Sequence, residues 1–461
     1  MSASGSTRAL ADDLARLVGS EHVLSGSAAR PYETDATANR GLRGHADAVV
    51  VPANVEEVAS VMAWSYERGV PLVPRGGGTG LAGGAVPVDG GVVLSMERFD
   101  KVVEVAAERW RITTQAGVTT QTVRRLARES GLFFPPDPGA AEQSQIGGNV
   151  ATNAGGPHAF KYGATGAWVT GIEALTPPGT VVRFGGEQRK DVGGYDLKDL
   201  LIGSEGTLAV ITSVVLRLLP APEQTLALVL FFGSLEDGVK CAGEILACGM
   251  RAAALDYLDE RTMEIVSGSY PGEIPADSKF ALIVELDGGR EEVAQQRQDL
   301  DEITEGLALA VDEPVASELW RWRDGVSGAV ATVMGGKVSE DVVVPPRLLA
   351  EAIRRLDDIG EEFGLPTCSW GHAGDGNMHA TFLVDPDRPE TLAQAEHAAD
   401  SLFGMAVELG GGVSGEHGIG YLKRGQLARQ WNEEAIELQE RVKEMFDPRD
   451  LLNPGKKLAR V

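Results

Sequence analysis

Three of the seven histidines lie in two short glycine-rich segments of the 461-residue chain. GHAGDGNMHA (371–380) places His372 and His379 on either side of Gly-Asp-Gly-Asn, a turn sequence that predicts a fold-back bringing the imidazoles together. Glu416 stands in the glycine-flanked segment SGEHGIG (414–420). Two imidazoles and a carboxylate suit Zn²⁺, with Mn²⁺ or Fe²⁺ as alternatives. We therefore predict a divalent-metal site, although a single histidine is more often a polar core or surface residue.

The histidine next to this carboxylate, His417, has the chemistry of a general base. An imidazole with a pKa near 6.5 can take a hydroxyl proton at neutral pH, and a bound metal would lower the pKa of a coordinated alcohol. Proton removal is half of an alcohol oxidation, and the hydride needs an acceptor such as a flavin. A metal site with two histidines and one carboxylate also suits a metal-dependent hydrolase, and this alternative stays open.

The net charge of the chain is −25, from 67 acidic and 42 basic residues. This field repels nucleic acid, anionic lipid and also an anionic substrate, so an acid substrate would require basic residues concentrated in the site. Arg323 and Lys337, in the segment 319–345, could clamp a carboxylate through a bidentate fork and a point charge. Either one, taken alone, is more often a solvated surface cation.

Glycine-dense segments crowd the first half of the chain. RGGGTGLAGGA (75–85) follows a second predicted strand and precedes a third, which is the wrong order for a Rossmann fingerprint. It fits either an anion-binding nest of backbone N–H groups or a tight turn. Further glycine-dense segments span 133–156, 161–179 and 190–220, and four such loops predict a long ligand.

Hydrophobic periodicity predicts the elements that carry these loops. At 461 residues the chain exceeds one hydrophobic core, so two domains are expected. The first half reads as β-α-β, and the second as an antiparallel sheet with helices on one face, which together give an α+β fold. We predict a helix over 7–18, strands over 48–52, 71–74, 92–96, 227–232 and 280–287, a helix capped by Asn54, and a helix over 291–308.

Several classes are disfavoured by what the chain lacks. No apolar run approaches the ~20 residues that span a bilayer, and the N-terminus shows no export signal. Cys241, Cys248 and Cys368 fit small buried hydrophobes rather than a disulfide framework or an iron–sulfur site. These features fit a reducing cytoplasm, with a peripheral membrane position as the alternative.

The motifs together resemble the FAD-linked oxidoreductases of the vanillyl-alcohol oxidase and p-cresol methylhydroxylase type. Within that family the chain looks like the branch of D-lactate dehydrogenase, the glycolate oxidase FAD subunit and D-2-hydroxyglutarate dehydrogenase. The resemblance runs from about residue 30 to 458 and rests on eight motifs in the family's order: PRGGGTG (74–80), PPDPG (135–139), IGGNVATNAGG (146–156), KYG (161–163), IGSEGTLAVIT (202–212), GHAGDGNMH (371–379), SGEHGIG (414–420) and DPRDLLNPGK (447–456).

The resemblance implies an N-terminal FAD-binding domain over 1–220, with its core at about 45–220, and a ferredoxin-like substrate and metal domain over 221–461. Residues 425–461 are expected to return to the flavin. It places the metal ligands at His372, His379 and Glu416, the base at His417, and the substrate contacts at Arg323, Ser327, Lys337 and Thr381. The implied cofactor residues are Pro74, Arg75, Gly76, Gly77, Gly78, Thr79, Gly80, Pro136, Asp137, Pro138, Gly139, Gly147, Gly148, Asn149, Thr152, Asn153, Gly155, Gly163, Glu205, Gly206, Ile211 and Asn453.

Two departures from the family pattern bear on cofactor and substrate. No His or Cys stands in the loop 75–85 or in PPDPG, so the resemblance implies noncovalent FAD. Thr381 stands where the hydroxyglutarate enzymes carry Asn, and Ser327 stands where Thr is usual, so D-lactate and glycolate become as eligible as D-2-hydroxyglutarate.

The expected reaction is oxidation of a small anionic D-2-hydroxy acid to its 2-oxo acid. Electrons would leave to a partner protein, a quinone or oxygen, and a homodimer is an open alternative. The resemblance also admits a flavin-dependent alkyl-transfer synthase and a noncatalytic FAD-binding subunit, although the intact His417 argues against the latter.

Overall fold

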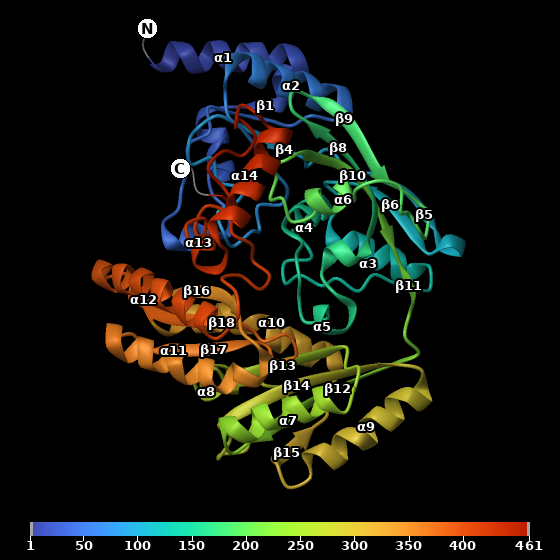
Figure 1. Cartoon of the computed structure of the whole chain (residues 1–461), viewed down its shortest axis with the longest axis vertical. Helices are drawn as coiled ribbons and strands as arrows, with labels where there is room; N and C mark the ends of the chain where they lie inside the picture. The colour runs from blue at the N-terminus through green and yellow to red at the C-terminus, as the bar shows by residue number, and fades with distance from the viewer. Residues whose placement is uncertain (1–2, 459–461) are drawn as a thin grey trace. The chain divides into compact units, whose positions relative to one another are not determined.

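The computed structural model describes residues 3–458, and its contacts divide the chain into two compact units. Both units mix helices and strands, which confirms the predicted α+β class. Their elements can be followed by label and colour in Figure 1. Unit 1 consists of Met1–Gly156, Ala164–Ala221 and His417–Val461, and unit 2 consists of Pro157–Gly163 and Pro222–Glu416.

Unit 1 begins with α1 (Ala3–Val18) and a four-stranded sheet of order β1-β2-β4-β3. The predicted β-α-β unit is confirmed, because β2 and β3 both pair in parallel with β4 and α2 connects them. Asn54 caps α2 by accepting a hydrogen bond from the N–H of Glu57 at 2.9 Å. The bounds are β1 (Val23–Leu24), β2 (Ala48–Val50), α2 (Val55–Arg68), β3 (Leu72–Arg75) and β4 (Val92–Ser95).

A second sheet of unit 1 is antiparallel, with the order β5-β6-β10-β8-β9. A short pair, β7 with β11, is separate from it. The strands are β5 (Val102–Ala106), β6 (Arg111–Gln115), β7 (Leu132–Phe133), β8 (Val169–Thr176), β9 (Thr180–Gly185), β10 (Val210–Arg217) and β11 (Leu219–Pro220), and the helices among them are α3 (Thr120–Glu129), α4 (Ile146–Thr152) and α6 (Leu197–Leu201).

The C-terminal segment from His417 belongs to unit 1. It contains α13 (Leu427–Gln430) and α14 (Glu433–Phe446) and then passes along the edge of the first sheet. There Leu452 bridges Leu72 of β3 in parallel, and the N–H of Asn453 donates to the carbonyl of Leu72 at 2.7 Å. Leu452 and Asn453 are thereby held beside the strand that leads into the glycine loop 75–85.

Unit 2 is built on a seven-stranded sheet of order β15-β12-β14-β13-β17-β18-β16, in which every neighbouring pair is antiparallel. Its strands are β12 (Gln224–Phe232), β13 (Ala254–Asp259), β14 (Phe280–Gly288), β15 (Ala308–Asp312), β16 (Gly336–Val343), β17 (Thr367–His372) and β18 (Asn377–Val384). Its helices are α5 (Ala159–Tyr162), α7 (Leu235–Ala247), α8 (Glu260–Val266), α9 (Arg290–Thr304), α10 (Ala316–Val333), α11 (Leu349–Phe363) and α12 (Pro389–Glu408).

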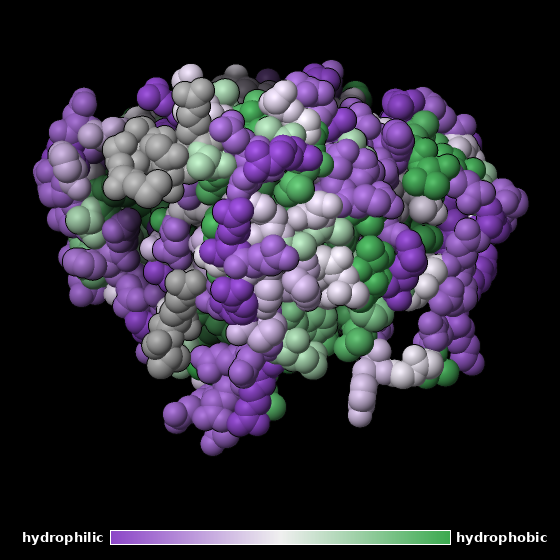
Figure 2. Space-filling model, turned by 90° about the horizontal axis from the view of Figure 1, so that it is seen from above, coloured by the Kyte–Doolittle hydropathy of each residue, from purple (hydrophilic) through white to green (hydrophobic). Residues whose placement is uncertain are grey.

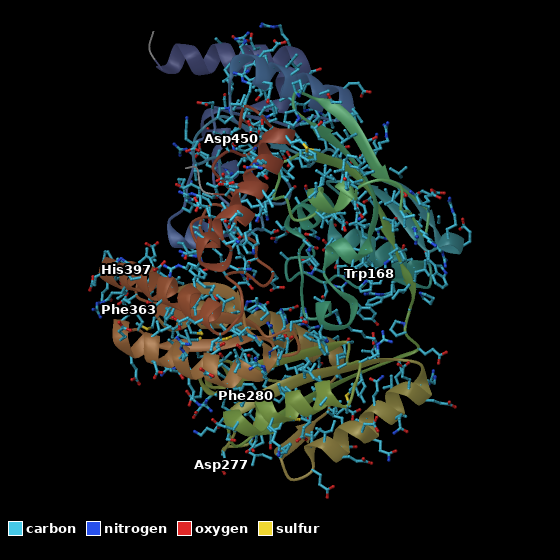
Figure 3. The ribbon with its side chains drawn as sticks, viewed as in Figure 1. Trp168, Asp277, Phe280, Phe363, His397 and Asp450 are labelled. Atoms are coloured by element: carbon cyan, nitrogen blue, oxygen red, sulfur yellow. The ribbon has the colours of Figure 1, made fainter. Side chains whose placement is uncertain are left out.

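Helices cover both faces of this sheet, so the prediction of helices on one face is wrong. Successive residues of a strand point to opposite faces. In β14, Ala281 belongs to a buried cluster with residues of α8 and α10, whereas its neighbour Phe280 packs against Gly238 of α7 (Figure 3). Five consecutive residues of β14, from Phe280 to Val284, are apolar and buried, and after Glu285 the buried Leu286 follows. A nearly continuous apolar run of this kind is typical of a strand buried on both faces.

The three cysteines were predicted to be small buried hydrophobic residues. Cys241 and Cys368 are buried as predicted, but Cys248 is exposed, so it is not a core residue.

Within residues 3–458, no helix has the length and apolar character required to cross a bilayer. On the face that Figure 2 shows, hydrophilic residues predominate and hydrophobic ones lie in small groups among them.

Candidate functional site

The two histidines predicted as metal ligands lie on one β-hairpin of unit 2. β17 ends at His372, β18 begins at Asn377, and the register pairs Trp370 with His379. Both imidazoles therefore lie on the same face of the hairpin, with ring centroids 5.4 Å apart, and both residues are buried. The predicted fold-back at Gly-Asp-Gly-Asn is confirmed.

The carboxylate of Glu416 lies between these imidazoles. Its Oε1 is 3.5 Å from Nε2 of His372 and 3.4 Å from Nε2 of His379. One ligand atom from each of the three residues lies within 4.8 Å of the others. Donors bound tetrahedrally to Zn²⁺ at 2.0–2.1 Å are about 3.3 Å apart, so the two separations from Glu416 are close to those of a metal site.

Asp256 of β13 is a functional candidate that sequence reasoning missed. Its carboxylate is fully buried, with Oδ1 2.7 Å from Nδ1 of His372 and Oδ2 accepting a 2.7 Å hydrogen bond from Nε of Arg323. A carboxylate behind a metal-binding histidine orients the ring and raises its basicity. Asp256 lies 116 residues before His372, and no local pattern marks it.

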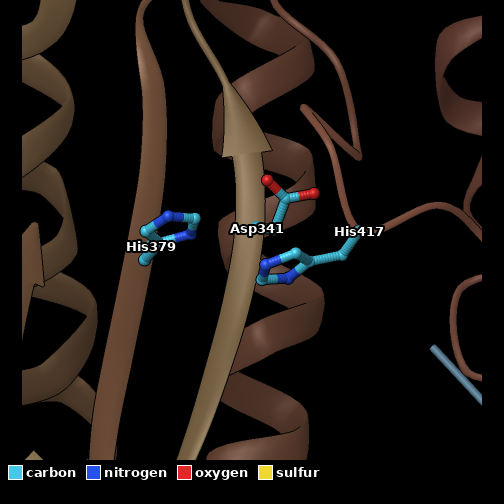
Figure 4. Close-up of side chains that lie close together, drawn as sticks. All are labelled: Asp341, His379 and His417. Carbon is cyan, nitrogen blue, oxygen red and sulfur yellow. The ribbon is translucent and has the colours of Figure 1, made fainter. Parts of the chain in front are cut away.

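Asp341 of β16 is a second candidate that was missed. It is opposite His379 in the register of β16 and β18, and Figure 4 shows the two side chains on these neighbouring strands. Its carboxylate accepts hydrogen bonds from the hydroxyl of Ser414 at 2.7 Å and from the N–H of Gly415 at 2.9 Å and of Glu416 at 3.1 Å. Asp341 thereby holds the segment that presents Glu416.

The electrostatics of this cluster call for a positive charge. Burial acts to lower the pKa of His372, but the carboxylates of Asp256 and Glu416 outweigh it and raise the pKa well above its ordinary value. The raised pKa favours a proton on His372 when no metal is bound, and Arg323 further offsets the charge of Asp256. A divalent cation would replace that proton, because metal binding requires neutral imidazoles and releases protons. The donor set therefore fits a metal in both spacing and charge.

The two predicted substrate cations are buried and already hydrogen-bonded. Arg323 on α10 pairs with Asp256, as described above. Lys337 on β16 donates to the carbonyl and hydroxyl oxygens of Ser327 at 2.8 and 2.7 Å, and its ammonium lies 4.9 Å from the centroid of the Trp370 ring. Burial lowers the pKa of Lys337 to about 8.

Thr381 and His417 complete the predicted substrate and base residues. Thr381 is fully buried on β18, and its hydroxyl is 2.8 Å from that of Ser339 on the adjacent strand. His417 is half-buried and is the first residue of unit 1, joined by a peptide bond to Glu416 at the end of unit 2. The boundary between the units therefore falls between the predicted metal ligand and the predicted base.

Most of the predicted cofactor residues cluster in unit 1. A Cβ on Gly77 would be 2.1 Å from the carbonyl oxygen of Gln143, and one on Gly76 would be 3.6 Å from Cα of Gly148, so the loop 74–80 packs against the segment leading into α4. Gly206, at φ +71°, lies against Pro74 and Asn453.

Four of the segments are thus brought together, namely 74–80, 147–153, 205–206 and Asn453. Asp137 lies against Gly156, three residues beyond the segment 147–153. Ile211 is buried on β10, and Gly163 falls in unit 2. The guanidinium of Arg75 lies against Gly78, whose Cβ position is 2.1 Å from Nη2, and Nη1 donates to the carbonyl of Thr34 at 2.7 Å.

Buried polar atoms beside this loop fit a bound ligand. Among the residues that the structure describes, Oε1 of Gln145 and Oδ2 of Asp35 are buried without a hydrogen-bond partner. They lie 3.5 Å from the Cβ position of Gly76 and 4.0 Å from that of Gly80, respectively. A buried polar atom without a partner is costly, and a ligand with donor groups would satisfy it.

Lys456 is a cation beside the same loop that sequence reasoning did not single out. It is buried, and its ammonium donates to the carbonyl of Gly84 at 2.8 Å and to the side-chain oxygen of Asn453 at 2.6 Å. Burial lowers its pKa to about 7. It is the last residue of the motif DPRDLLNPGK (447–456), from which only Asn453 was predicted to contact the cofactor.

Two family models match the chain. The FAD binding domain model matches residues 46–185, and the model of the C-terminal domain of FAD linked oxidases matches residues 221–457. The second match alone spans more than half of the chain.

Relatives match over nearly their whole length. The chain is 34% identical to the glycolate oxidase subunit GlcD of Bacillus subtilis, covering 98% of this chain and 97% of that protein. It is 38% identical to a D-lactate dehydrogenase of Archaeoglobus fulgidus, covering 90% and 91%. It is 33% identical to a D-2-hydroxyglutarate dehydrogenase of Xanthomonas citri pv. viticola, covering 89% and 88%. For the fold, p-cresol methylhydroxylase superposes with a TM-score of 0.81 at 16% identity, covering 99% of this chain and 97% of that one.

Proposed function

Since the chain belongs to the family of FAD-linked oxidases, we propose that this FAD-linked oxidoreductase oxidises a small D-2-hydroxy acid to its 2-oxo acid. The relatives at 33–38% identity bear the names of enzymes for glycolate, D-lactate and D-2-hydroxyglutarate. These three acids share a carboxylate next to a carbon that carries a hydroxyl, so the substrate we propose is defined by this shared group.

Unit 1 would hold the FAD noncovalently. The segments 74–80, 136–139 and 147–155, with Glu205, Gly206, Ile211 and Asn453, supply a glycine-rich cradle, and Gly163 would reach the cofactor from the segment 157–163. When bound, FAD supplies the acceptor for the two electrons that the alcohol loses. The unsatisfied polar atoms of Gln145 and Asp35 beside the loop support this placement. The division we propose is an FAD domain over 1–220 and a substrate domain over 221–461, with 425–461 returning to the flavin.

Unit 2 would bind the substrate and a divalent metal, with zinc as the first candidate. His372, His379 and Glu416 would hold the metal, which when bound supplies Lewis acidity to a coordinated hydroxyl. Arg323 and Lys337 would neutralise the carboxylate of the acid, and Ser327 and Thr381 would line its binding position. Burial of both cations strengthens their attraction for an anion, because charges interact more strongly away from water.

His417 would take the proton of the 2-hydroxyl on one of its imidazole nitrogens. Its peptide bond to Glu416 ties the base to a metal ligand, and Asp341 holds the backbone just before it. A neutral imidazole is the form that accepts a proton at neutral pH.

The observation that carries the proposal is the cluster in which Asp256 links a metal-ligand candidate, His372, to a carboxylate-binding candidate, Arg323. A single buried carboxylate positions both groups that a 2-hydroxy acid would need, one for its hydroxyl and one for its carboxylate. A metal-dependent hydrolase would require the metal site but not the FAD domain matched over 46–185.

The test is reduction of the bound flavin under anaerobic conditions. D-lactate, L-lactate, glycolate and D-2-hydroxyglutarate are offered separately to chelator-treated and to zinc-restored protein, and the flavin absorption band is followed. We expect bleaching by one of the non-L acids, faster in the metal-restored protein, and identification of the 2-oxo acid as product.

Two variants sharpen this test. His417→Gln is expected to slow bleaching by about 100-fold or more, since general base catalysis contributes about 10²–10⁴. His397→Gln is the matched control, because His397 is exposed on the outer side of α12 (Figure 3). A flavin that none of the acids bleaches, or a purified protein without flavin, would contradict the proposal.

A further inference from the structure

Two arginines face each other at one end of the five-stranded sheet of unit 1. Arg111 is the first residue of β6, Arg217 is the last residue of β10, and the antiparallel register pairs them directly. Like charges directly opposite in a sheet are destabilising. Repulsion between the two guanidiniums therefore destabilises the sheet at this position, and a bound anion would reduce that repulsion.

A third arginine and two tryptophans complete the group. Arg189 lies in the segment after β9, and its guanidinium carbon is 5.1 Å from the centroid of the Trp110 ring. The guanidinium carbon of Arg217 is 4.4 Å from the centroid of the Trp168 ring. The carbonyl of Trp110 accepts hydrogen bonds from Nη1 of Arg111 at 3.1 Å and from the N–H of Leu218 at 2.8 Å. The rings support the guanidiniums without neutralising them.

The backbone of Trp110 adopts a rare left-handed conformation that places its ring against Arg189. Trp110 has a φ of +56° and follows the short 3₁₀ helix Ala107–Arg109 between β5 and β6. The left-handed region is a rare conformation for a bulky residue, and hairpin loops of this kind favour glycine there. The chain instead places an indole ring, 37% exposed, beneath Arg189.

The three arginines differ from their neighbours in forming no ion pair within residues 3–458, although the charge of Glu187, the ion-pair partner of Arg109, also acts on Arg111. Arg109 forms ion pairs with Glu104 and Glu187, and Arg183 pairs with Glu173. Among residues 3–458, no carboxylate lies within ion-pair distance of Arg111, Arg189 or Arg217. Arg111 is only 5% exposed, and its Nε is buried without a hydrogen-bond partner in the described part of the chain. In a chain of net charge −25, acidic partners are abundant, so their absence here is informative.

We propose that Arg111, Arg189 and Arg217 form a binding site for the phosphoryl group of a small molecule. Three guanidinium forks offer bidentate donors for a tetrahedral oxyanion, and the half-exposed Trp110 ring offers an apolar surface for the remainder of the ligand. The net charge of the chain repels anionic polymers, so a small ligand fits better than a nucleic acid. Burial, together with the positive charges of Arg189 and Arg217, lowers the pKa of Arg111, and the charge of Glu187 offsets this only in part.

The test is calorimetric titration of the FAD-loaded protein with inorganic phosphate, glycerol 3-phosphate and citrate, each at the same ionic strength. The bound FAD prevents the added phosphate from occupying a vacant cofactor site. We expect saturable binding of both phosphate compounds, and Arg189→Gln and Arg217→Gln are each expected to raise the Kd by about tenfold or more. Both side chains are exposed, so these substitutions leave the core intact.

The matched control is Arg183→Gln, which removes the same charge from an exposed residue of the same sheet. It is expected to change the Kd less than about twofold, because its charge is already compensated by Glu173. The proposal is overturned if the native protein binds neither phosphate compound, if the control weakens binding as much as Arg189→Gln and Arg217→Gln do, or if citrate binds and phosphate does not. Flavin reduction is not the readout, so this outcome is independent of the proposed oxidation.

Discussion

Asp256 is a fully buried carboxylate that contacts two candidate site residues at once. Replacing it with Asn preserves its shape but removes the charge that orients His372 and neutralises Arg323. We expect Asp256→Asn to bind zinc about 10–100-fold more weakly, because such supporting carboxylates contribute about that much to metal affinity. The measurement is a competition titration against a chelator of known affinity.

The control for this variant is Asp277→Asn, which removes the same charge from an exposed turn of unit 2 (Figure 3). Its zinc affinity should equal that of the native protein. Circular dichroism of both variants checks that the fold is retained. Unchanged zinc affinity in a folded Asp256→Asn protein would refute the supporting role of Asp256.

Lys337 should make the KM for the acid depend on pH. Its pKa of about 8 means that it loses its proton as the pH rises through about 8, and a neutral amine no longer attracts a carboxylate. The KM for the acid should therefore rise above about pH 8, while kcat changes less. A bound anion raises the pKa of the lysine, so the midpoint in KM lies at or above this value.

The conservative variant Lys337→Arg separates this titration from others. A guanidinium stays charged throughout the accessible range, so its KM should remain flat between about pH 7 and 9.5. Steady-state kinetics of the two proteins across that range is the measurement. Identical KM profiles would show that another group is responsible.

At the scale of elements, the hairpin of β17 and β18 positions both candidate metal histidines. Its turn depends on Gly376, which has a φ of +70° and whose Cβ, if added, would lie 1.9 Å from the carbonyl oxygen of Val344. No side chain can be accommodated there without moving the backbone. Gly376→Ala should therefore displace His372 from His379 and lower both zinc content and stability.

Gly364 provides the matched comparison, because its φ is +67° but nothing lies within 4 Å of its Cβ position. Gly364→Ala should cost only the strain of the left-handed conformation, about 1–2 kcal/mol. Gly376→Ala should lower the free energy of unfolding by about 1–3 kcal/mol more than Gly364→Ala does. This is the usual cost of forcing atoms into an occupied position. Urea unfolding of the two variants measures the difference, and equal costs would contradict the steric argument.

At the scale of the whole molecule, the chain crosses between its units more often than a two-domain sequence suggests. Residues 157–163 belong to unit 2, although both flanking segments belong to unit 1. Within unit 2, Lys161 forms an ion pair with the buried Asp287 of β14, and the hydroxyl of Tyr162 donates to the same carboxylate at 2.6 Å. His158 contacts Glu285 of the same strand, with Nε2 2.7 Å from Oε1.

Removing Lys161 from its buried ion pair with Asp287 should destabilise the fold. Lys161→Met leaves Asp287 buried with a missing cation, which typically destabilises by about 3–5 kcal/mol. The expected result is a lower urea midpoint for the protein. Lys279→Met is the comparison, since Lys279 pairs with Glu260 at the surface and should change the midpoint little. Equal midpoints for the two variants would contradict the stabilising role of the segment 157–163.

Local sequence was sufficient for several strands and helices and for the hairpin. Apolar runs at 48–52, 71–74, 92–96, 227–232 and 280–287 became strands, because short apolar runs bounded by turn residues favour a buried strand whichever partner they pair with. The turn Gly-Asp-Gly-Asn brought His372 and His379 together for the same reason, since turn residues act through their own dihedral angles. The one-sided helical cover was a misreading, because a nearly continuous apolar run indicates burial on both faces.

The tertiary structure alone decided which distant residues support the site. Asp256 and Asp341 face their partners because β13 lies beside β17 and β16 beside β18, an order of strands that no segment of the sequence encodes by itself. The same holds for the C-terminal segment beside β3 and for the opposed Arg111 and Arg217. Residue types and their spacing along the chain determined the available chemistry. The pairing of strands far apart in sequence determined which charged side chains meet. The reason is that side-chain interactions act over a few ångströms of space, whatever the separation along the chain.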